Sequence, residues 1–178
     1  HHVAILVNNA GAARSAKFAT TDDGLWDAML RVNLSGTFHC TRAALPELLK
    51  AKHGRVVNVA STAGLTGYPY VAAYCAAKHG VVGLTRALAL ELAATQVTVN
   101  AVCPGYTDTD IVSEAVANIA AKTGRSAADA RSSLVARNPQ RRLVTPDEVA
   151  ATVAWLCLPE SSAITGQAIS ISGGEVLN

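Results

Sequence analysis

The stretch AAYCAAKHGVVGLTRALALELA, residues 72–93, combines an apolar helical pattern with a tyrosine and a lysine, Tyr74 and Lys78, four residues apart. Residues at this spacing lie on the same face of a helix, so the two side chains are expected to be neighbours. A segment rich in alanine and leucine favours burial, and burying a phenol beside an ammonium group is costly. The pair is therefore either a surface pair at the start of a helix or a functional pair.

Four short apolar runs around this helix are rich in β-branched residues and do not alternate with polar ones, which is typical of parallel strands covered on both faces. The predicted strands are residues 3–8, 55–60, 97–102 and 168–172. The predicted helices are residues 22–52, 72–94, 110–137 and 146–157. Thr145, Pro146 and Glu148 form a start signal for the last helix, and Ser126 begins a weaker one. The alternation predicts an α/β fold with a parallel sheet.

Composition narrows the class of protein. With 178 residues, of which 50% are hydrophobic and 16% charged, the chain is long enough for one domain with its own core. A net charge of +2 is too small to indicate binding to nucleic acid or to a membrane surface. We find no apolar run of about 18 residues and no signal-peptide pattern, so we predict a cytoplasmic protein without a membrane segment. The four cysteines form no CxxC pair, so we predict buried, reduced thiols and no metal site.

The Tyr74–Lys78 pair suggests a specific chemistry. A free tyrosine has a pKa of about 10, and lowering it to about 7 needs about 4 kcal/mol of differential interaction. A neighbouring ammonium group and a cofactor cation together favour the phenolate. Such a tyrosine would act as a general acid that protonates a carbonyl oxygen, and as the base in the reverse reaction.

Further motifs occur in a fixed order around the pair. NNAG (8–11), NVAS (58–61) and CPGYTDT (103–109) each follow or end a predicted strand, and VNLSG (32–36) lies inside the first predicted helix. In an open α/β sheet, ligands bind at the carboxyl ends of the strands, where three of these motifs lie. Each motif alone is also explained by ordinary turn and capping chemistry, but their joint order favours a site.

With these motifs, nearly the whole chain resembles the short-chain dehydrogenase/reductase family. The resemblance implies a Rossmann-like, doubly wound parallel sheet, NAD or NADP as the cofactor, and a catalytic tetrad formed by Asn33, Ser61, Tyr74 and Lys78. It implies that Tyr74 is the acid/base, that Lys78 lowers its pKa and holds the nicotinamide ribose, and that Ser61 binds the substrate oxygen. It also implies that Asn33 kinks its helix and holds a water that connects Lys78 to solvent.

The resemblance also implies the contacts to the cofactor. Asn8, Ala10 and Gly11 would support the adenosine side. The segment PGYTDT matches a family pattern whose nicotinamide-facing positions here are Pro104, Gly105, Thr107 and Thr109.

Compared with the family pattern, residues 1–178 form one catalytic domain without its Gly-rich, nucleotide-binding βαβ part, since no G-x-x-x-G-x-G precedes NNAG. We therefore expect a longer protein, in which the missing part decides between NAD and NADP. Near the carboxyl end, Ser172 stands where family members often have an acid.

Two subfamilies resemble the chain most: β-ketoacyl and polyketide ketoreductases, and 3-hydroxybutyrate dehydrogenases. The latter grip a small carboxylate with polar side chains at three positions that are here Ala13, Ala63 and Val71. A free carboxylate would be desolvated there without partners. We therefore expect a 3-oxoacyl or 3-hydroxyacyl thioester, under an apolar lid at residues 110–143, with 3-hydroxybutyrate or another small alcohol or ketone as the alternative.

Other partners are suggested less directly. The basic cluster Arg131, Arg137, Arg141 and Arg142 would meet the phosphates of coenzyme A or an acyl carrier protein, or else form a solvated helix end. Gly80 and Gly83 inside a helix suggest close helix packing in a homodimer or homotetramer, the latter common in the family. A non-catalytic NAD(P)-binding sensor or scaffold, and a sugar, steroid or xenobiotic alcohol as substrate, remain alternatives.

Overall fold

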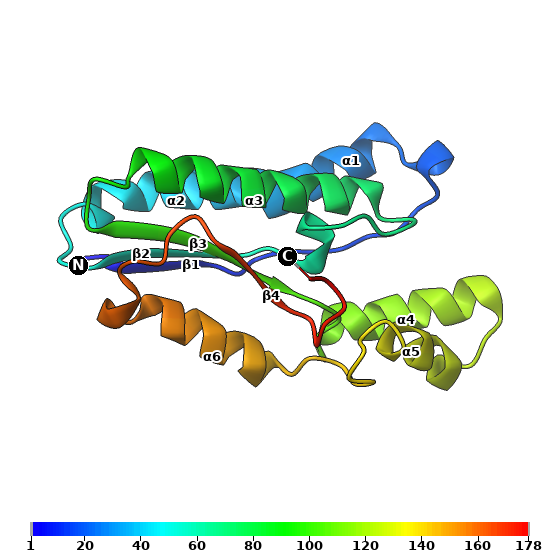
Figure 1. The fold of residues 1–178 in the computed structure, drawn as a ribbon. Coiled ribbons are helices and arrows are strands. Elements are labelled where there is room, and N and C mark those ends of the chain that lie inside the picture. Colours follow the sequence, from blue (N-terminus) through cyan, green and yellow to red (C-terminus); the bar gives the residue numbers. More distant parts are fainter. Residues whose placement is uncertain (1, 178) are drawn as a thin grey trace.

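The computed structural model describes residues 2–177 and contains a parallel sheet of four strands (Figure 1). The strands are β1 (Ile5–Asn8), β2 (Gly54–Val59), β3 (Val97–Pro104) and β4 (Ala168–Ile171). They lie side by side in the order β1-β2-β3-β4, and all three pairings are parallel. This confirms the predicted Rossmann-like parallel sheet.

Helices cover both faces of the sheet. Their bounds are α1 (Asp23–Leu30), α2 (Gly36–Leu48), α3 (Ala72–Glu91), α4 (Asp110–Thr123), α5 (Ala127–Val135) and α6 (Pro146–Cys157). Figure 1 shows α1, α2 and α3 on one face and α6 on the other, with α4 and α5 beyond the carboxyl ends of the strands. The sheet is therefore doubly wound.

Two predicted helices are interrupted. The helix expected at 22–52 changes to a π-helical turn, Arg31–Ser35, between α1 and α2. The helix expected at 110–137 ends at Gly124, which has a φ of 69°, and restarts at the Ser126 cap. A glycine adopts this left-handed conformation at no steric cost, so it ends α4 and separates two helices that the sequence pattern joins.

The core lies around the two central strands. Every residue of β3 is buried, and Val56 and Val57 of β2 are each 1% exposed. The edge strands differ, because Ile5 and Val7 of β1 are 49% and 40% exposed. The prediction of strands covered on both faces is therefore correct for β2 and β3 and wrong for β1 in this chain.

The capping prediction for α6 is confirmed. The Thr145 side chain accepts from the Glu148 backbone N–H, and the Glu148 carboxylate accepts from the Thr145 backbone N–H. Together these bonds satisfy two backbone donors that a helix start otherwise leaves unpaired.

The cysteine prediction is correct only in part. All four thiols are free, but Cys40 is exposed and Cys157 is half-buried, while Cys75 and Cys103 are buried. Cys40 lies on α2, which carries an exposed face as well as a buried one, and apolar composition alone did not separate the two. Among residues 2–177, no group of histidine, cysteine, aspartate and glutamate is arranged to hold a metal ion. None of the helices in the same range has the length and apolar character needed to cross a membrane.

The two helix glycines of α3 differ in their surroundings. A Cβ on Gly80 would lie 2.7 Å from the Leu34 side chain, whereas one on Gly83 would meet nothing within 4 Å. Gly80 therefore allows α3 to approach the π-helical turn inside one chain. Contact with another subunit is not needed to explain it.

Candidate functional site

The predicted site lies where β2 ends and α3 begins. Ser61 follows β2 and caps a short 3-10 helix, Thr62–Gly64, its hydroxyl oxygen accepting a bond of 3.1 Å from the Ala63 backbone N–H. Tyr74 and Lys78 lie one turn apart on α3, and the Lys78 Nζ is 5.7 Å from the centre of the Tyr74 ring. The strand end and the first turns of the helix thus bring the three side chains together.

Lys78 is a buried cation, 4% exposed. Its Nζ donates a bond of 2.8 Å to the Val59 carbonyl oxygen at the end of β2, and no carboxylate pairs with it among the residues described. Burial lowers the pKa of Lys78 to about 8, because removing an ammonium group from water disfavours its charged form. The lysine therefore keeps N–H groups that a ligand can use.

Tyr74 titrates differently from what the sequence suggests. Burial raises the pKa of the phenol, and a hydrogen-bonding interaction with the Ser61 side chain lowers it in part. Lys78 is not among the groups that lower it. In the chain by itself, desolvation therefore sets the direction of the shift. The lowering expected from Lys78 together with a cofactor cation stays a prediction.

Asn33 lies in the π-helical turn and is 1% exposed. Its Nδ2 donates to the Ala12 carbonyl at 2.9 Å and to the Met29 carbonyl at 3.0 Å, and its Oδ1 accepts from the Ala12 N–H at 3.2 Å. The side chain thus ties the segment after β1 to the helix. A Cβ on Gly11 would lie 2.9 Å from this Oδ1 and 3.6 Å from the Lys78 Nζ, so Asn33 and Lys78 both approach Gly11.

The three residues predicted near the adenosine have unequal surroundings. Ala10 and Gly11 are exposed at the end of β1. The Asn8 side chain donates hydrogen bonds to Thr41 Oγ1 at 2.9 Å and to Asn58 Oδ1 at 2.8 Å. The Asn58 Nδ2 in turn donates to Thr85 Oγ1 at 2.9 Å. Asn8 therefore joins β1, β2 and the helices α2 and α3 in one polar network, a role that its position after a strand did not reveal.

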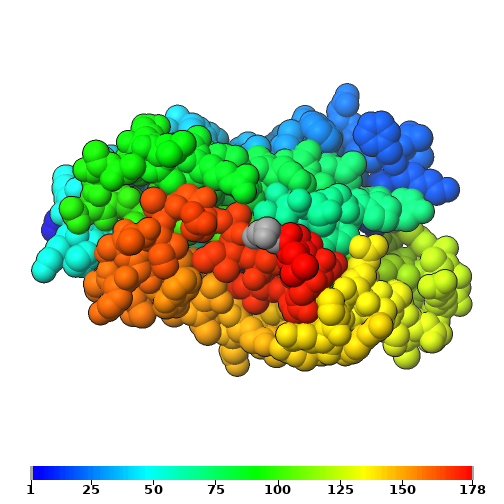
Figure 2. Space-filling model, in the orientation of Figure 1, coloured from blue at the N-terminus to red at the C-terminus, as the bar shows by residue number. Residues whose placement is uncertain are grey.

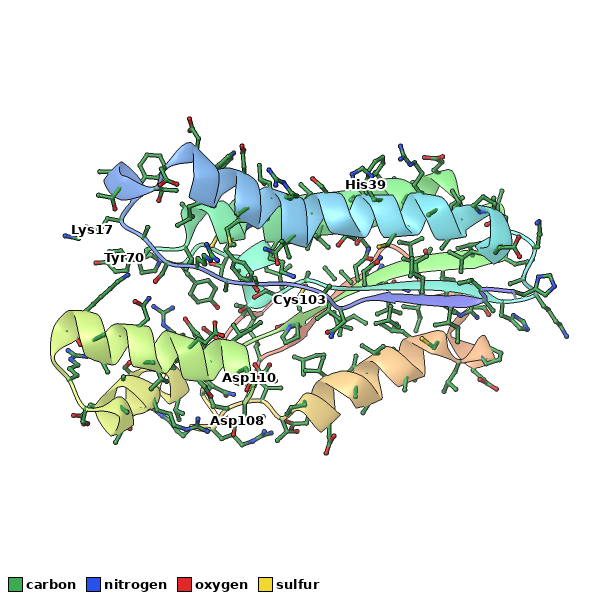
Figure 3. The ribbon with its side chains drawn as sticks, turned by 180° about the vertical axis from the view of Figure 1, so that it is seen from behind. Lys17, His39, Tyr70, Cys103, Asp108 and Asp110 are labelled. Atoms are coloured by element: carbon green, nitrogen blue, oxygen red, sulfur yellow. The ribbon has the colours of Figure 1, made fainter. Side chains whose placement is uncertain are left out.

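The segment predicted near the nicotinamide leaves the carboxyl end of β3. Pro104 is buried, and the Gly105 N–H donates to the Ile171 carbonyl at 3.0 Å. Thr107 bonds the Gly105 carbonyl at 3.1 Å, and Thr109 precedes α4. Figure 3, seen from behind, shows Cys103 at the sheet and Asp108 and Asp110 beside the start of α4. This segment therefore leads from the sheet end to the predicted lid.

Three residues that sequence reasoning missed gather next to this segment. Tyr68 Oη lies 2.9 Å from Thr62 Oγ1 and 2.8 Å from Glu175 Oε1, and its ring packs edge-on against Tyr106 at 6.2 Å between centres. Tyr106 stands inside PGYTDT, and Glu175 follows the glycine pair near the carboxyl end. Only the spacing of PGYTDT gave a signal, and it did not distinguish Tyr106 from its neighbours.

The four arginines of the predicted basic cluster have different partners within the chain. Arg131 pairs with Asp108 at 2.9 Å, and Arg142 pairs with Glu148 at 2.6 Å. Arg141 donates one long bond of 3.4 Å to a backbone carbonyl. The Arg137 guanidinium lies 5.0 Å from the centre of the Tyr68 ring and has no carboxylate partner within residues 2–177.

Comparison with known proteins defines the class. Residues 1–175 match the family model described as enoyl-(acyl carrier protein) reductase, and the chain belongs to the short-chain dehydrogenase/reductase family of oxidoreductases. This family membership confirms the resemblance drawn from the sequence motifs.

Individual relatives are similar over most of the chain. A D-beta-hydroxybutyrate dehydrogenase of Cupriavidus necator is 42% identical over 97% of this chain and 67% of its own length. A 3-oxoacyl-(acyl-carrier-protein) reductase of Thermotoga maritima is 39% identical over 97% and 66%. A crystal structure of an actinorhodin polyketide ketoreductase variant with NADPH has a TM-score of 0.93 and 42% identity, covering 98% of this chain and 67% of that one. The chain spans about two thirds of the length of these relatives.

The residues present fit the nicotinamide-ribose part of a dinucleotide. Lys78 offers buried N–H groups that have no carboxylate partner among the described residues, suited to sugar hydroxyls. Gly11 leaves open the space that a Cβ would take beside Asn33 and Lys78. Both features lie at the carboxyl ends of parallel strands, where such folds bind nucleotides.

Proposed function

We propose that the protein catalyses reversible, NAD(P)-dependent hydride transfer on a 3-oxoacyl or 3-hydroxyacyl group linked as a thioester. The observation that carries this proposal is the convergence of Ser61, Tyr74 and Lys78 at the end of β2, with Asn33 behind them. A half-buried phenol, a hydroxyl group and a cation in one place are the groups that carbonyl reduction needs from a protein.

In the proposed reaction the cofactor supplies or accepts the hydride. Ser61 and Tyr74 hold the carbonyl oxygen by hydrogen bonds, and Tyr74 Oη gives it a proton as the alcohol forms. Lys78 would hold the ribose hydroxyls of the bound cofactor, and its positive charge would favour the phenolate left on Tyr74 once the phenol is surrounded by cofactor and substrate. Asn33 fixes the segment after β1 through Ala12, keeping Gly11 and Lys78 in place.

Electrostatics favours a neutral acyl substrate. The positions that would grip a free carboxylate are Ala13, Ala63 and Val71, none of which carries a polar side chain. An anion would lose its hydration there without compensation. The printed names of the relatives include both ketoacyl reductases and hydroxybutyrate dehydrogenases, so 3-hydroxybutyrate oxidation is the second candidate.

Several finer expectations stay predictions. These are the lid at 110–143, the contacts from Asn8, Ala10, Gly11, Pro104, Gly105, Thr107 and Thr109 to the cofactor, an acyl carrier protein or coenzyme A as the carrier, a cytoplasmic location, and a homodimer or homotetramer.

A substrate panel tests the proposal. The full-length protein is offered acyl thioesters of 3-oxobutanoate, free acetoacetate and cyclic ketones with NADH or NADPH, and the absorbance of the reduced cofactor is followed. We expect the thioesters to give the highest kcat/KM and the Tyr74→Phe variant to lose about 10²–10⁴-fold in kcat/KM on all of them. Faster turnover of acetoacetate would favour the dehydrogenase, and cofactor binding with no turnover of any ketone would favour a sensor.

A further inference from the structure

The chain turns sharply after β4 and brings Glu175 between two segments of the proposed site. Gly173 and Gly174 have positive φ angles of 61° and 92°, and the Glu175 N–H donates to the Ser172 carbonyl at 3.2 Å. Glycine adopts such angles without a steric penalty, so the sequence favours this turn. Figure 2 shows the C-terminal residues in red between the blue-green segment after β2 and the yellow segment after α5.

The Tyr68 hydroxyl group connects Glu175 to the first of these segments, which follows β2. Tyr68 Oη lies 2.9 Å from Thr62 Oγ1 and 2.8 Å from Glu175 Oε1. A phenol has one proton and an ionised carboxylate only accepts, so Tyr68 donates to Glu175 and accepts from the Thr62 hydroxyl. Thr62 itself is 3% exposed. Two consecutive hydrogen bonds therefore join Glu175 to the residue that follows Ser61.

The other carboxylate oxygen of Glu175 lies against the second segment, which leaves β3. A Cβ on Gly105 would be 3.1 Å from Glu175 Oε2. This oxygen is buried and has no donor among residues 2–177, which lowers stability. An apolar side chain of similar length would avoid that cost but would lose the bond to Tyr68. Stability of the fold alone therefore does not explain a carboxylate here.

The Ser61 turn, which is Ser61 with the 3-10 helix Thr62–Gly64, is held from two sides. On one side it lies against α3, because a Cβ on Gly64 would be 2.7 Å from the Lys78 carbonyl oxygen. On the other side Thr62 is bound to Tyr68. The bond between Tyr68 and Glu175 therefore fixes the side of the turn that α3 does not hold.

We propose that Tyr68 and Glu175 are positioning residues, which hold the Ser61 hydroxyl where it binds the substrate oxygen. Misplacing a group of the site by about 1 Å can reduce the rate by about 10²-fold, so the support of this turn affects turnover. The two residues act through Ser61 and require no contact with substrate or cofactor. This inference rests on the proposed function and adds a support for its site from the C-terminal end of the chain.

Steady-state kinetics of the full-length protein test the inference. Tyr68→Phe and Glu175→Ala each remove the bond between the two side chains, and each should lower kcat for a 3-oxoacyl thioester by about three- to eightfold. The KM for the nicotinamide cofactor should change by less than about twofold, since both variants keep Lys78. Glu175→Gln keeps an acceptor for Tyr68 and should retain the kcat of the parent protein. Glu91→Ala is the matched control, because Glu91 is exposed at the end of α3 and forms no side-chain hydrogen bond among residues 2–177.

The Ser61→Ala background separates positioning from general support of the fold. Adding Tyr68→Phe or Glu175→Ala to Ser61→Ala should change kcat by less than about twofold, because the group that they position is already absent. An equal loss of kcat in both backgrounds overturns the inference. A kcat for Glu175→Gln as low as that for Glu175→Ala also overturns it.

Amide hydrogen exchange gives a measurement that needs no turnover. The N–H groups of Gly64 and Leu65 donate to carbonyls of the Ser61 turn at 2.8 and 2.9 Å. Exchange in residues 61–65 should be faster by about threefold or more in the two variants that break the bond, and unchanged in Glu175→Gln and in the control. Unchanged exchange in every variant overturns the inference. If the protein reduces no 3-oxo compound but exchange changes as expected, the proposed function fails and the support of the Ser61 turn by Tyr68 and Glu175 stands.

Discussion

Tyr74 and Tyr68 lie six residues apart and are both half-buried, but their hydroxyl groups have different partners. Tyr68 Oη has two partners within the chain, Thr62 and Glu175, and stands on a loop. Tyr74 stands on α3, where it interacts with Ser61 and lies near the Lys78 ammonium group. Burial is the main cause that raises the pKa of each phenol.

The difference teaches which of the two half-buried phenols is available for chemistry. The Tyr68 hydroxyl is committed to a carboxylate, which favours the neutral phenol and holds its proton. Within residues 2–177 the Tyr74 hydroxyl has no carboxylate partner; it interacts with the Ser61 hydroxyl, and the Lys78 ammonium group lies 5.7 Å from the centre of its ring. Both groups can stabilise a phenolate when the site is filled. The same residue type therefore supports a structural contact in one place and proton transfer in the other.

The largest expected effect is on turnover when the two tyrosines are changed in turn. Tyr74→Phe should lower kcat/KM for the thioester substrate by about 10²–10⁴-fold, the contribution usual for a positioned acid or base. Tyr68→Phe keeps the ring and loses only the hydroxyl, so turnover should fall by less than about tenfold, with folding unchanged by circular dichroism. Comparable losses in the two variants would remove the distinction between them.

Lys78 provides the next test, through the dependence of stability on pH. Burial lowers its pKa from the ordinary value of 10.5 to about 8 in the folded protein. Below pH 8 both states carry the charge and the folded state bears the desolvation cost. Between the two values only the unfolded state stays protonated, so stability rises with pH. This lysine should recover about 3 kcal/mol of unfolding free energy across that window.

Lys78→Met is the matched variant, because methionine has similar length and no charge. Chemical denaturation at pH 7 and pH 10.5 gives the unfolding free energy of both proteins. Relative to Lys78→Met, the protein with Lys78 should gain about 3 kcal/mol of unfolding free energy at the higher pH. The variant should be inactive at both. If the difference in unfolding free energy between the two proteins does not depend on pH, Lys78 is well hydrated. The difference between Tyr74 and Tyr68 would then depend on Ser61 alone.

Strand and helix patterns predicted the fold well because burial of β2, β3 and the covering helices follows from local hydrophobicity. The Tyr74–Lys78 pair was predictable because one helix carries both residues. Asn8 was harder, since its bonds to Thr41 and Asn58 join segments 33 and 50 residues apart. Glu175 and Tyr68, which are 107 residues apart, meet only through the tertiary fold. The direction of the Tyr74 pKa shift needed the extent of desolvation, which a sequence does not give.

The smallest expected effect concerns the two glycines that precede Tyr68. A Cβ on Gly64 would lie 2.7 Å from the Lys78 carbonyl oxygen, a backbone atom of α3, whereas one on Gly67 would meet nothing within 4 Å. Gly64→Ala must therefore move the Ser61 turn away from α3 and should lower the unfolding free energy by about 1–3 kcal/mol.

Gly67→Ala is the control from the Tyr68 side. It should change the unfolding free energy by less than about 1 kcal/mol and in the stabilising direction, because alanine restricts the unfolded chain. Thermal and chemical denaturation of both variants give the comparison. If Gly64→Ala is as well tolerated as Gly67→Ala, the Ser61 turn is not held against the backbone of α3. The packing of the Ser61 turn beside Tyr74 would then be no more rigid than the loop that carries Tyr68.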